Sequence, residues 1–341
     1  SALAFLSREI RAVASRTTGV VEFAPRMRTY EPSQRRSVFA AISAALGEAA
    51  PGFDLPGAYE APSHPAVVQD AAPVVSMIVR TFDRPRFLRR ALQSVQAQTY
   101  PNTEAVVINN GGEGARVAAI CAEFPRARLV SIEKSNIADA ATRGVEEARG
   151  RYAGLLDDDD LLFPDHVRRL CDALVRSGAR AAYGDAVNIY LRTVGASYAV
   201  SGYRGIFVPA LERTTMLSVC QVVGSSRIMF DREFVLGSGG FRPEFFPADD
   251  YEAWLRIIES SDVVRVAAVT SLYTQFLDRS NTSTARGPDY VAAHKAIYEA
   301  YPSTRQAVVA KREQLLAEID RRGGHGMAPP AVVFDPQPLL F

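Results

Sequence analysis

The sequence is poor in the features that mark disulfide scaffolds, zinc centres and membrane spans. Its three cysteines and four histidines show no metal-ligand spacing, so we expect free thiols in a reducing compartment. No apolar run approaches the roughly 20 residues that cross a bilayer. Lysine plus arginine (39) nearly equals aspartate plus glutamate (38), which gives no reason to expect nucleic acid as a partner. Since the first residues do not suit a signal peptide, we expect a soluble, cytoplasmic protein.

The composition changes twice along the chain. Residues 1–72 hold two segments rich in helix-forming residues and then a proline-rich linker, and we interpret them as a helical N-terminal extension. Residues 73–285 alternate apolar runs with amphipathic segments, as an α/β domain does. Residues 286–341 predict C-terminal helices followed by an extended tail.

Within the middle part, predicted strands and helices follow one another in regular alternation. Each apolar run of strand length precedes a segment whose apolar residues recur at helical spacing. This order predicts a mostly parallel, Rossmann-like sheet flanked by helices and joined by right-handed crossovers. We expect strands at 74–79, 104–108, 128–132 and 152–156, with helices at 87–98, 115–124 and 138–149.

The carboxyl ends of parallel strands meet at one edge of the sheet, where open α/β sheets bind ligands. The cleft should therefore be lined by the loops at 80–86, 109–114, 133–137 and 157–160. Further along, the pattern predicts helices at 164–177 and 251–259 and strands at 179–189, 226–230, 262–266 and 269–276. Residues 190–224 show no clear period, and a helix pair is expected between residues 289 and 322.

Four consecutive aspartates, Asp157 to Asp160, follow the fourth strand. Like charges this close repel and raise one another's pKa values, so the run is costly without a counter-charge. A solvated turn with an N-capping aspartate explains one or two of these acids but not all of them. A hard divalent cation shared with a substrate phosphate would relieve the repulsion. The run therefore favours a metal site.

Several motifs occur in the order typical of one family. Residues 75–85 read Val-Ser-Met-Ile-Val-Arg-Thr-Phe-Asp-Arg-Pro, and residues 94–101 end in Gln-Thr-Tyr-Pro. Arg143 precedes the acidic run, and a Gly-Gly-Phe at 239–241 precedes an acidic helix start at 249–256. In these motifs the chain resembles a family-2 glycosyltransferase of the GT-A type. The resemblance implies inverting transfer of a sugar from a nucleotide donor to a glycan or other hydroxyl acceptor, as in polysaccharide synthesis.

The same resemblance assigns roles within the acidic run. Asp157 and Asp159 form the Asp-x-Asp pair, and Asp159 would be the direct ligand of Mn²⁺ or Mg²⁺, ions that suit carboxylate and phosphate oxygens. Asp157 would lie nearer the ribose of the donor or the water shell of the metal. Asp158 and Asp160 are expected to hold the turn and cap the next helix, and Asp158 is also counted among the donor-binding residues.

Inverting transfer also needs a base that removes the proton of the acceptor hydroxyl. The family's base stands at the start of the later acidic helix, where the matching residue is Asp250. Asp249 and Asp250 would equally suit a helix N-terminus, because the macrodipole favours negative charge there. This structural explanation serves about equally well for Asp249 and less well for Asp250. Trp254 is expected to pack the helix.

The donor site departs from the family pattern at the nucleobase. Asn109 stands where the family has an aspartate, and its amide oxygen could still accept a bond from a pyrimidine imide without offering charge. Thr81, Asp83 and Arg143 are expected to share the donor contacts. A UDP-sugar is the favoured donor.

The family's third metal ligand, often a histidine, has no counterpart at residues 273–278. Asp278 or a water molecule could substitute for it. His294 lies nearby in the sequence but within a predicted amphipathic helix, where a structural role is expected.

Other functions share parts of this pattern. A nucleotidyltransferase would use the same sheet, metal and nucleotide, but would have a glycine-rich loop after the first strand, where residues 80–85 hold no glycine. A nucleotide-sugar-binding module without catalysis would suit the amide at the base pocket, but would not need both Asp159 and Asp250. A glycoside hydrolase would need two carboxylates and no metal-binding run.

Overall fold

The computed structural model describes residues 21–22, 72–194, 197–206, 218–219, 223–276 and 287–321. The helices expected in the N-terminal extension, its linker, the extended tail and Asp278 all lie outside these residues. The division of the chain into three parts therefore stays a prediction. Among the described helices, none is both long and apolar enough to cross a membrane.

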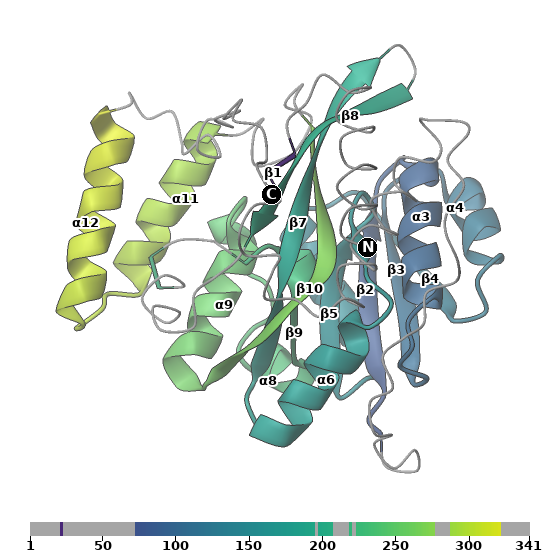
Figure 1. The fold of residues 1–341 in the computed structure, drawn as a ribbon, viewed down its shortest axis with the longest axis horizontal. Coiled ribbons are helices and arrows are strands. Elements are labelled where there is room, and N and C mark those ends of the chain that lie inside the picture. The colour runs from purple at the N-terminus through teal and green to yellow at the C-terminus, as the bar shows by residue number, and fades with distance from the viewer. Residues whose placement is uncertain are drawn as a thin grey trace, which may run out of the picture.

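A single mixed sheet organises the described residues (Figure 1). Its main path runs in the order β1-β8-β7-β9-β5-β2-β3-β4, and β10 pairs with both β7 and β6. The strands are β1 (Val21–Glu22), β2 (Val75–Thr81), β3 (Thr103–Asn110), β4 (Ala127–Ile132), β5 (Tyr152–Asp157), β6 (Leu161–Leu162), β7 (Ala181–Val194), β8 (Ser197–Ile206), β9 (Ile228–Asp231) and β10 (Val263–Phe276).

The first half of the sheet is parallel, as the alternation predicts. Strands β5, β2, β3 and β4 pair in parallel, and the intervening segments form α3 (Pro85–Gln96), α4 (Gly114–Cys121) and α5 (Ile137–Glu147). The register places Arg80 opposite Asp157 and Thr81 opposite Asn109. The carboxyl ends of these strands therefore open at one edge, where the predicted cleft loops meet.

The second half of the sheet is mixed, which agrees with the predicted mostly parallel sheet, because β10 runs parallel to β7 over most of its length. β9 runs antiparallel to β5 and β7, and β7 forms a hairpin with β8. This hairpin projects beyond the other strands (Figure 1) and occupies part of residues 190–224, where no element was predicted. The two strands expected at 262–266 and 269–276 are one strand, β10, because register shifts near Val269 interrupt its pattern without ending it.

Helices cover both faces of the sheet. α3 and α4 lie at one side of the molecule, and α11 and α12 lie at the opposite side beside α9 (Figure 1). The remaining helices are α6 (His166–Ser177), α8 (Arg232–Gly237), α9 (Asp249–Ser260), α11 (Gly287–Ala300) and α12 (Gln306–Arg321), with short 3₁₀ turns η3 (Ser225–Arg227) and η4 (Pro243–Phe245). The predicted helices at 164–177 and 251–259 and the C-terminal pair are thus confirmed within a few residues.

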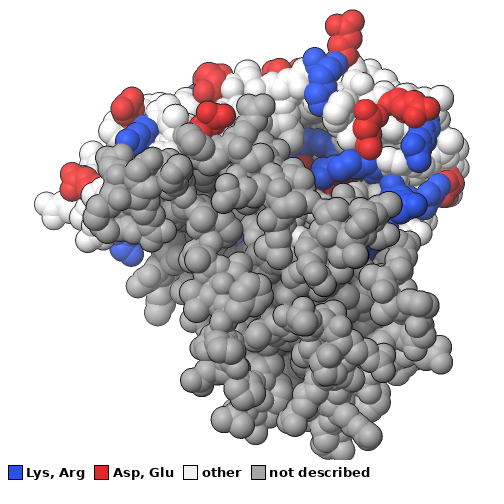
Figure 2. Space-filling model, turned by 90° about the horizontal axis from the view of Figure 1, so that it is seen from above, with Lys and Arg blue, Asp and Glu red and all other residues white. Residues whose placement is uncertain are grey.

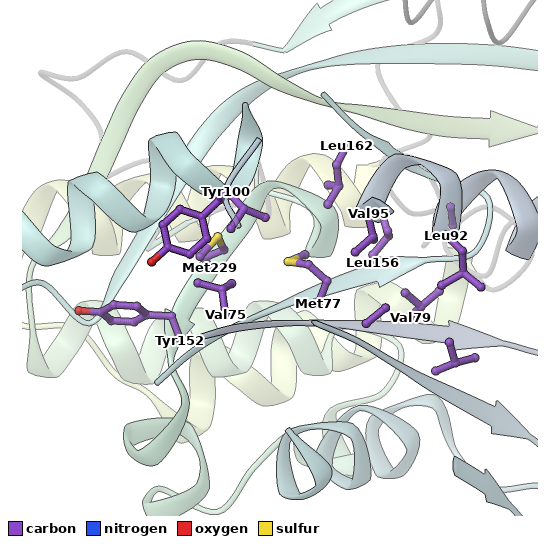
Figure 3. Close-up of a cluster of buried hydrophobic side chains, with 14 of the residues drawn as sticks. Val75, Met77, Val79, Leu92, Val95, Tyr100, Tyr152, Leu156, Leu162 and Met229 are labelled. Carbon is purple, nitrogen blue, oxygen red and sulfur yellow. The ribbon is translucent and has the colours of Figure 1, made fainter. Parts of the chain in front are cut away.

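The core has two layers, one on each face of β2. Val75, Met77 and Val79 enter a cluster with Leu92 of α3 (Figure 3), whereas Ile78 points into the cluster on the other face. Burial of each such side chain contributes about 1.5–3 kcal/mol. Because alternate side chains of β2 are buried in the two clusters, the strand is held firmly in the sheet. The loop after Thr81 therefore starts from a rigid position.

Two structural expectations for the second half are met. Trp254 is buried and packs against Phe230 and Phe241, with ring centroids 5.7 and 5.9 Å apart. His294 is buried in α11 and stacks on Tyr251 at 5.0 Å. Both side chains hold α9 in place, which matters because that helix begins with Asp249 and Asp250.

Candidate active site

The last two residues of β2 form hydrogen bonds with the first two aspartates of the acidic run. Arg80 donates from Nη2 to Asp157 Oδ1 at 2.6 Å, and the Thr81 hydroxyl donates to Asp158 Oδ2 at 2.7 Å. Both contacts follow from the parallel register that sets Arg80 beside Asp157. Thr81 therefore reaches the site indirectly, by holding a carboxylate.

A second arginine holds the next two aspartates. Arg84 lies between β2 and α3, contacts Asp158 through Nη2 and Asp159 Oδ2 through Nη1 at 2.7 Å, and keeps 40% of its side chain exposed. Burial raises the pKa of Asp158 to about 7, against the opposing effect of Arg84. Burial also raises the pKa of Asp159. The run is thus desolvated, and guanidinium groups offset part of that cost.

Asp160 ties the acidic run to the second half of the fold. Its Oδ1 accepts from the backbone N–H of Thr274 at 2.8 Å, and its Oδ2 accepts from the Ser226 hydroxyl at 2.5 Å. The expectation that it caps the next helix is wrong, since Asp165 occupies that N-cap position, without a side-chain capping bond. Burial raises the pKa of Asp160 well above its usual value. Its role is to join β5 to β10 and η3.

The acidic pair at the start of α9 comes to the same place from the other half of the fold. Asp249 and Asp250 are both buried, and Ser225 donates its hydroxyl to Asp250 Oδ2 at 2.8 Å. Burial and then repulsion from Asp250 raise the pKa of Asp249 to about 7, whereas Arg80 acts to lower it. Burial likewise raises the pKa of Asp250. Arg80 therefore influences both acidic sites.

The amides at the expected nucleobase pocket are engaged in local turns. Asn109 accepts from Gly112 N–H and donates to Gly112 O, both at 3.1 Å. Asn110 makes a similar exchange with Ser135, at 2.9 and 3.1 Å. Asp83 accepts from Glu113 N–H at 2.9 Å and has a positive φ of 51°. These side chains join the loops after β2, β3 and β4 into one wall.

An exposed aromatic side chain on that wall was not among the predicted site residues. Phe82 is 43% exposed, and Lys134 Nζ lies 3.3 Å from the centre of its ring. An apolar ring in a loop at the carboxyl end of a strand was the sequence signal that could have found it. Gly111 leaves room for Lys134 beside this loop, because a Cβ at residue 111 would lie only 2.7 Å from Lys134 Cβ.

Arg143 lies apart from the other predicted site residues. Its side chain is 48% exposed and pairs with Glu147 at 2.6 Å and Glu146 at 3.3 Å on the outer surface of α5. It lies six residues beyond Ile137, where the helix begins, or roughly 9 Å along the axis at 1.5 Å per residue. Arg80 and Arg84, rather than Arg143, therefore provide the positive charge beside the acidic run.

Positive and negative side chains are mixed on the face seen in Figure 2. Figure 2 shows basic side chains gathered toward the side of α3 and α4 with acidic side chains close to them.

A pocket beside Asp158 and Asp159 is lined also by Phe87, Arg90 and Leu272. This pocket lies next to the acidic run.

A divalent cation fits the donor chemistry of the acidic run, whose side chains offer only oxygen atoms in a desolvated, anionic setting. Among the described residues, however, no three His, Cys, Asp or Glu side chains are gathered in a way that could hold a metal ion. Asp157 is paired with Arg80, and Asp159 is paired with Arg84. A cation would have to replace at least one of these contacts.

Comparison with known proteins finds similarity to family 2 glycosyltransferases over part of the chain. Residues 76–229 match the model described as "Glycosyl transferase family 2". The glycosyltransferase GlyA of Streptococcus pneumoniae is 30% identical over 145 residues, which are 39% of this chain and 21% of that protein. The uncharacterized glycosyltransferase YwdF of Bacillus subtilis is 27% identical over 218 residues, 62% of this chain and 77% of that protein. The chain spans only about a fifth of the first two curated relatives.

Solved structures share the fold at low identity. S. aureus TarS 1-349, crystallised with UDP-GlcNAc, aligns over 73% of this chain and 72% of its own with a TM-score of 0.52 and 14% identity. The mannosyltransferase PcManGT from Pyrobaculum calidifontis, in complex with GDP-Man and Mn²⁺, covers 88% of this chain and 86% of its own with a TM-score of 0.52 and 15% identity. In residues 76–229 this chain is therefore similar to the family 2 glycosyltransferases, and its fold is the GT-A fold of these solved structures.

Proposed function

We propose that this chain is a metal-dependent, inverting glycosyltransferase that transfers a sugar from a nucleotide-diphosphate donor to an acceptor hydroxyl, in glycan or polysaccharide synthesis. The observation that carries the proposal is the meeting of two acidic sites at one edge of the sheet. One follows β5 and the other begins α9, and Arg80 influences both. Sugar transfer needs a site for an anionic leaving group and a separate base, and the two acidic sites supply these groups.

The acidic run would hold the cation, with Asp159 as direct ligand and Asp157 near the ribose or the water shell of the ion. A Mn²⁺ or Mg²⁺ ion bound there would neutralise negative charge that develops on the leaving diphosphate. Thr81 and Arg80 keep the carboxylates of Asp158 and Asp157 in place. Support comes from PcManGT, whose structure holds GDP-Man and Mn²⁺.

The wall formed by the loops after β2, β3 and β4 would take the nucleoside. Phe82 offers an exposed ring against which a base could stack, and Asp83 and Asn109 shape the turn beside it. A UDP-sugar is the donor that we favour, since TarS was crystallised with UDP and with UDP-GlcNAc. Because Asn109 is engaged with Gly112, base recognition would use its remaining acceptor capacity or backbone groups.

Asp250 would act as the base that accepts the proton of the acceptor hydroxyl. Burial raises its pKa, which makes the carboxylate a stronger base than a solvated aspartate. Ser225 donates to one of its oxygens and so fixes the orientation of the carboxylate. Asp249 would share the local charge with it rather than take the proton.

Calorimetric titration with UDP, GDP and dTDP, each with Mn²⁺ or with EDTA, tests the donor site. We expect UDP to bind in the presence of Mn²⁺ and to lose roughly 10- to 100-fold in affinity with EDTA, the scale on which disruption of metal sites acts. Nucleotide binding that EDTA leaves unchanged would refute the metal assignment. NMR of the product formed from a UDP-sugar then reports the anomeric configuration, and retention would refute the inverting mechanism.

A further inference from the structure

Arg84 occupies the place that a cation would need. Its two terminal nitrogens contact Asp158 and Asp159 at once, and the Nη1–Asp159 Oδ2 distance is 2.7 Å. Asp158 is fully buried and Asp159 nearly so. A buried carboxylate is costly without a positive partner, so Arg84 stabilises the run while no other cation is present.

The charges around the site favour such a counterion. Aspartates 157–160, 249 and 250 bring six carboxyl groups to this edge, against the guanidinium groups of Arg80 and Arg84. Arg80 is buried and held by Asp157. Arg84 is the more accessible of the two, with 40% of its side chain exposed.

Arg84 can also leave without disturbing the fold. It is the residue before α3, its side chain caps no backbone group of that helix, and partly exposed side chains change rotamer on a fast timescale. Its guanidinium carbon already lies 5.9 Å from the ring centre of Phe87, which offers an alternative contact. Rotation of one side chain would therefore expose Asp159.

We propose that Arg84 is a built-in counterion that holds Asp158 and Asp159 until the donor arrives, and that it then exchanges Asp159 for the donor's phosphate. This inference rests on the proposed function. A divalent ion at Asp159 repels a guanidinium that shares the same carboxylate. A diphosphate attracts it, because the planar guanidinium fits phosphate oxygens with paired hydrogen bonds. Without the donor, the metal and Arg84 thus compete for Asp159. With the donor bound, both act on its diphosphate.

The experiment uses the full chain and two probes, Mn²⁺ alone and UDP with saturating Mn²⁺. Electron paramagnetic resonance measures free Mn²⁺ during titration of the wild type, Arg84→Gln and Arg86→Gln. Arg86 is an exposed arginine two residues away, so it controls for general charge. We expect Arg84→Gln to bind Mn²⁺ alone about 5- to 10-fold more tightly than the wild type, on the usual scale of coupling between sites. Arg86→Gln should stay close to the wild type.

The second probe should respond in the opposite direction. Loss of a charge-assisted bond to phosphate should weaken UDP binding by Arg84→Gln about tenfold with Mn²⁺ saturating. Unchanged Mn²⁺ affinity, equal tightening in the Arg86 control, or unchanged UDP affinity would each overturn the exchange. A wild type that binds no Mn²⁺ even with UDP would instead refute the metal-dependent function itself, so the two failures are distinct. Urea unfolding of each variant checks that the fold is retained.

Discussion

The acidic run after β5 and the acidic pair that begins α9 use the same side chain in different surroundings. In the run, Asp157 and Asp159 are each paired with an arginine at 2.6 and 2.7 Å. In the pair, Asp250 is bonded to the hydroxyl of Ser225, and the charge of Arg80 acts on it through space. The two settings differ in the partners of the carboxylates, guanidinium groups in one and a hydroxyl in the other, whereas burial raises carboxyl pKa values in both.

This difference separates binding from proton transfer. Carboxylates that hold arginine in the free protein are suited to exchange one cation for another. A buried carboxylate with a raised pKa and a fixed orientation is suited to accept a proton. Arg80 connects the two settings, because it binds Asp157 and also lowers the proton affinity of Asp249 and Asp250. If the two settings have these separate roles, variants in the acidic run should change donor binding and variants in the α9 pair should change the transfer rate.

The largest effect is expected from Asp250→Asn. Removal of a general base should lower the transfer rate by about 100- to 10,000-fold, while the affinity for UDP with Mn²⁺ stays near that of the wild type. The amide keeps the volume of the side chain and can still accept the hydrogen bond of Ser225. Rates of transfer from a UDP-sugar and calorimetry with UDP measure the two quantities.

Asp249→Asn is the matched control, since it changes the neighbouring buried acid of the same helix turn. It should reduce the rate far less. Transfer by Asp250→Asn at a near wild-type rate would show that the base lies elsewhere.

The next effect concerns the residue that the two settings share. Arg80→Met leaves the half-buried carboxylate of Asp157 and the buried carboxylates of Asp249 and Asp250 without their common positive charge. Removal of one partner of a buried ion pair typically costs about 3–5 kcal/mol, and urea unfolding at pH 8 should show a loss of this size. Arg89→Met, which removes an exposed partner of Glu123, should cost well under 1 kcal/mol. Equal losses in both variants would mean that Arg80 does not compensate the buried acids.

A smaller effect is expected on donor binding alone. Asp159→Asn should weaken Mn²⁺-dependent UDP binding by about 100-fold, the upper end of what changes around metal ligands cost. Asp158→Asn should weaken it by about tenfold or less, since its carboxylate is already engaged by Thr81. Calorimetry with and without EDTA gives both values. Equal losses in two folded variants would mean that the ligands are assigned wrongly.

Local patterns in the sequence predicted the parallel half of the sheet and the position of the acidic run. The apolar strand before Asp157 and the amphipathic helices around it follow from periodicity within short windows. The hydrogen-bonded pairs that hold the first three aspartates of the run join residues 75 to 77 positions apart, such as Thr81 with Asp158 and Arg84 with Asp159. No local period reports such contacts, which is why Arg80 and Arg84 were not predicted.

Two other features were missed for different physical reasons. The β7–β8 hairpin lies in residues whose pattern is irregular, and antiparallel pairing depends on tertiary context as much as on propensity. The engagement of Asn109 with Gly112 was open to prediction, because asparagine readily bonds to the backbone a few residues ahead in a turn. Its side chain closes its own loop through two hydrogen bonds with Gly112.

The smallest predicted effect tests the acidic pair through pH. The folded-state pKa of Asp249 is about 7, whereas an unfolded aspartate has a pKa of about 3.9. Between these values the unfolded chain has released a proton that the folded chain keeps. The stability contributed by Asp249 is therefore fully present below about pH 4 and is lost as pH rises toward 7. Asp249→Asn resembles the protonated form and avoids that loss.

We therefore expect Asp249→Asn to be more stable than the wild type at pH 8 and less distinguishable from it at pH 5. The gain should be about 1–2 kcal/mol, because the amide also gives up the attraction of Arg80. Urea unfolding without added metal at the two pH values measures it. A difference that is the same at both pH values would show that Asp249 is ionised in the folded protein throughout this range. The assignment of proton transfer to α9 would then lose its physical basis.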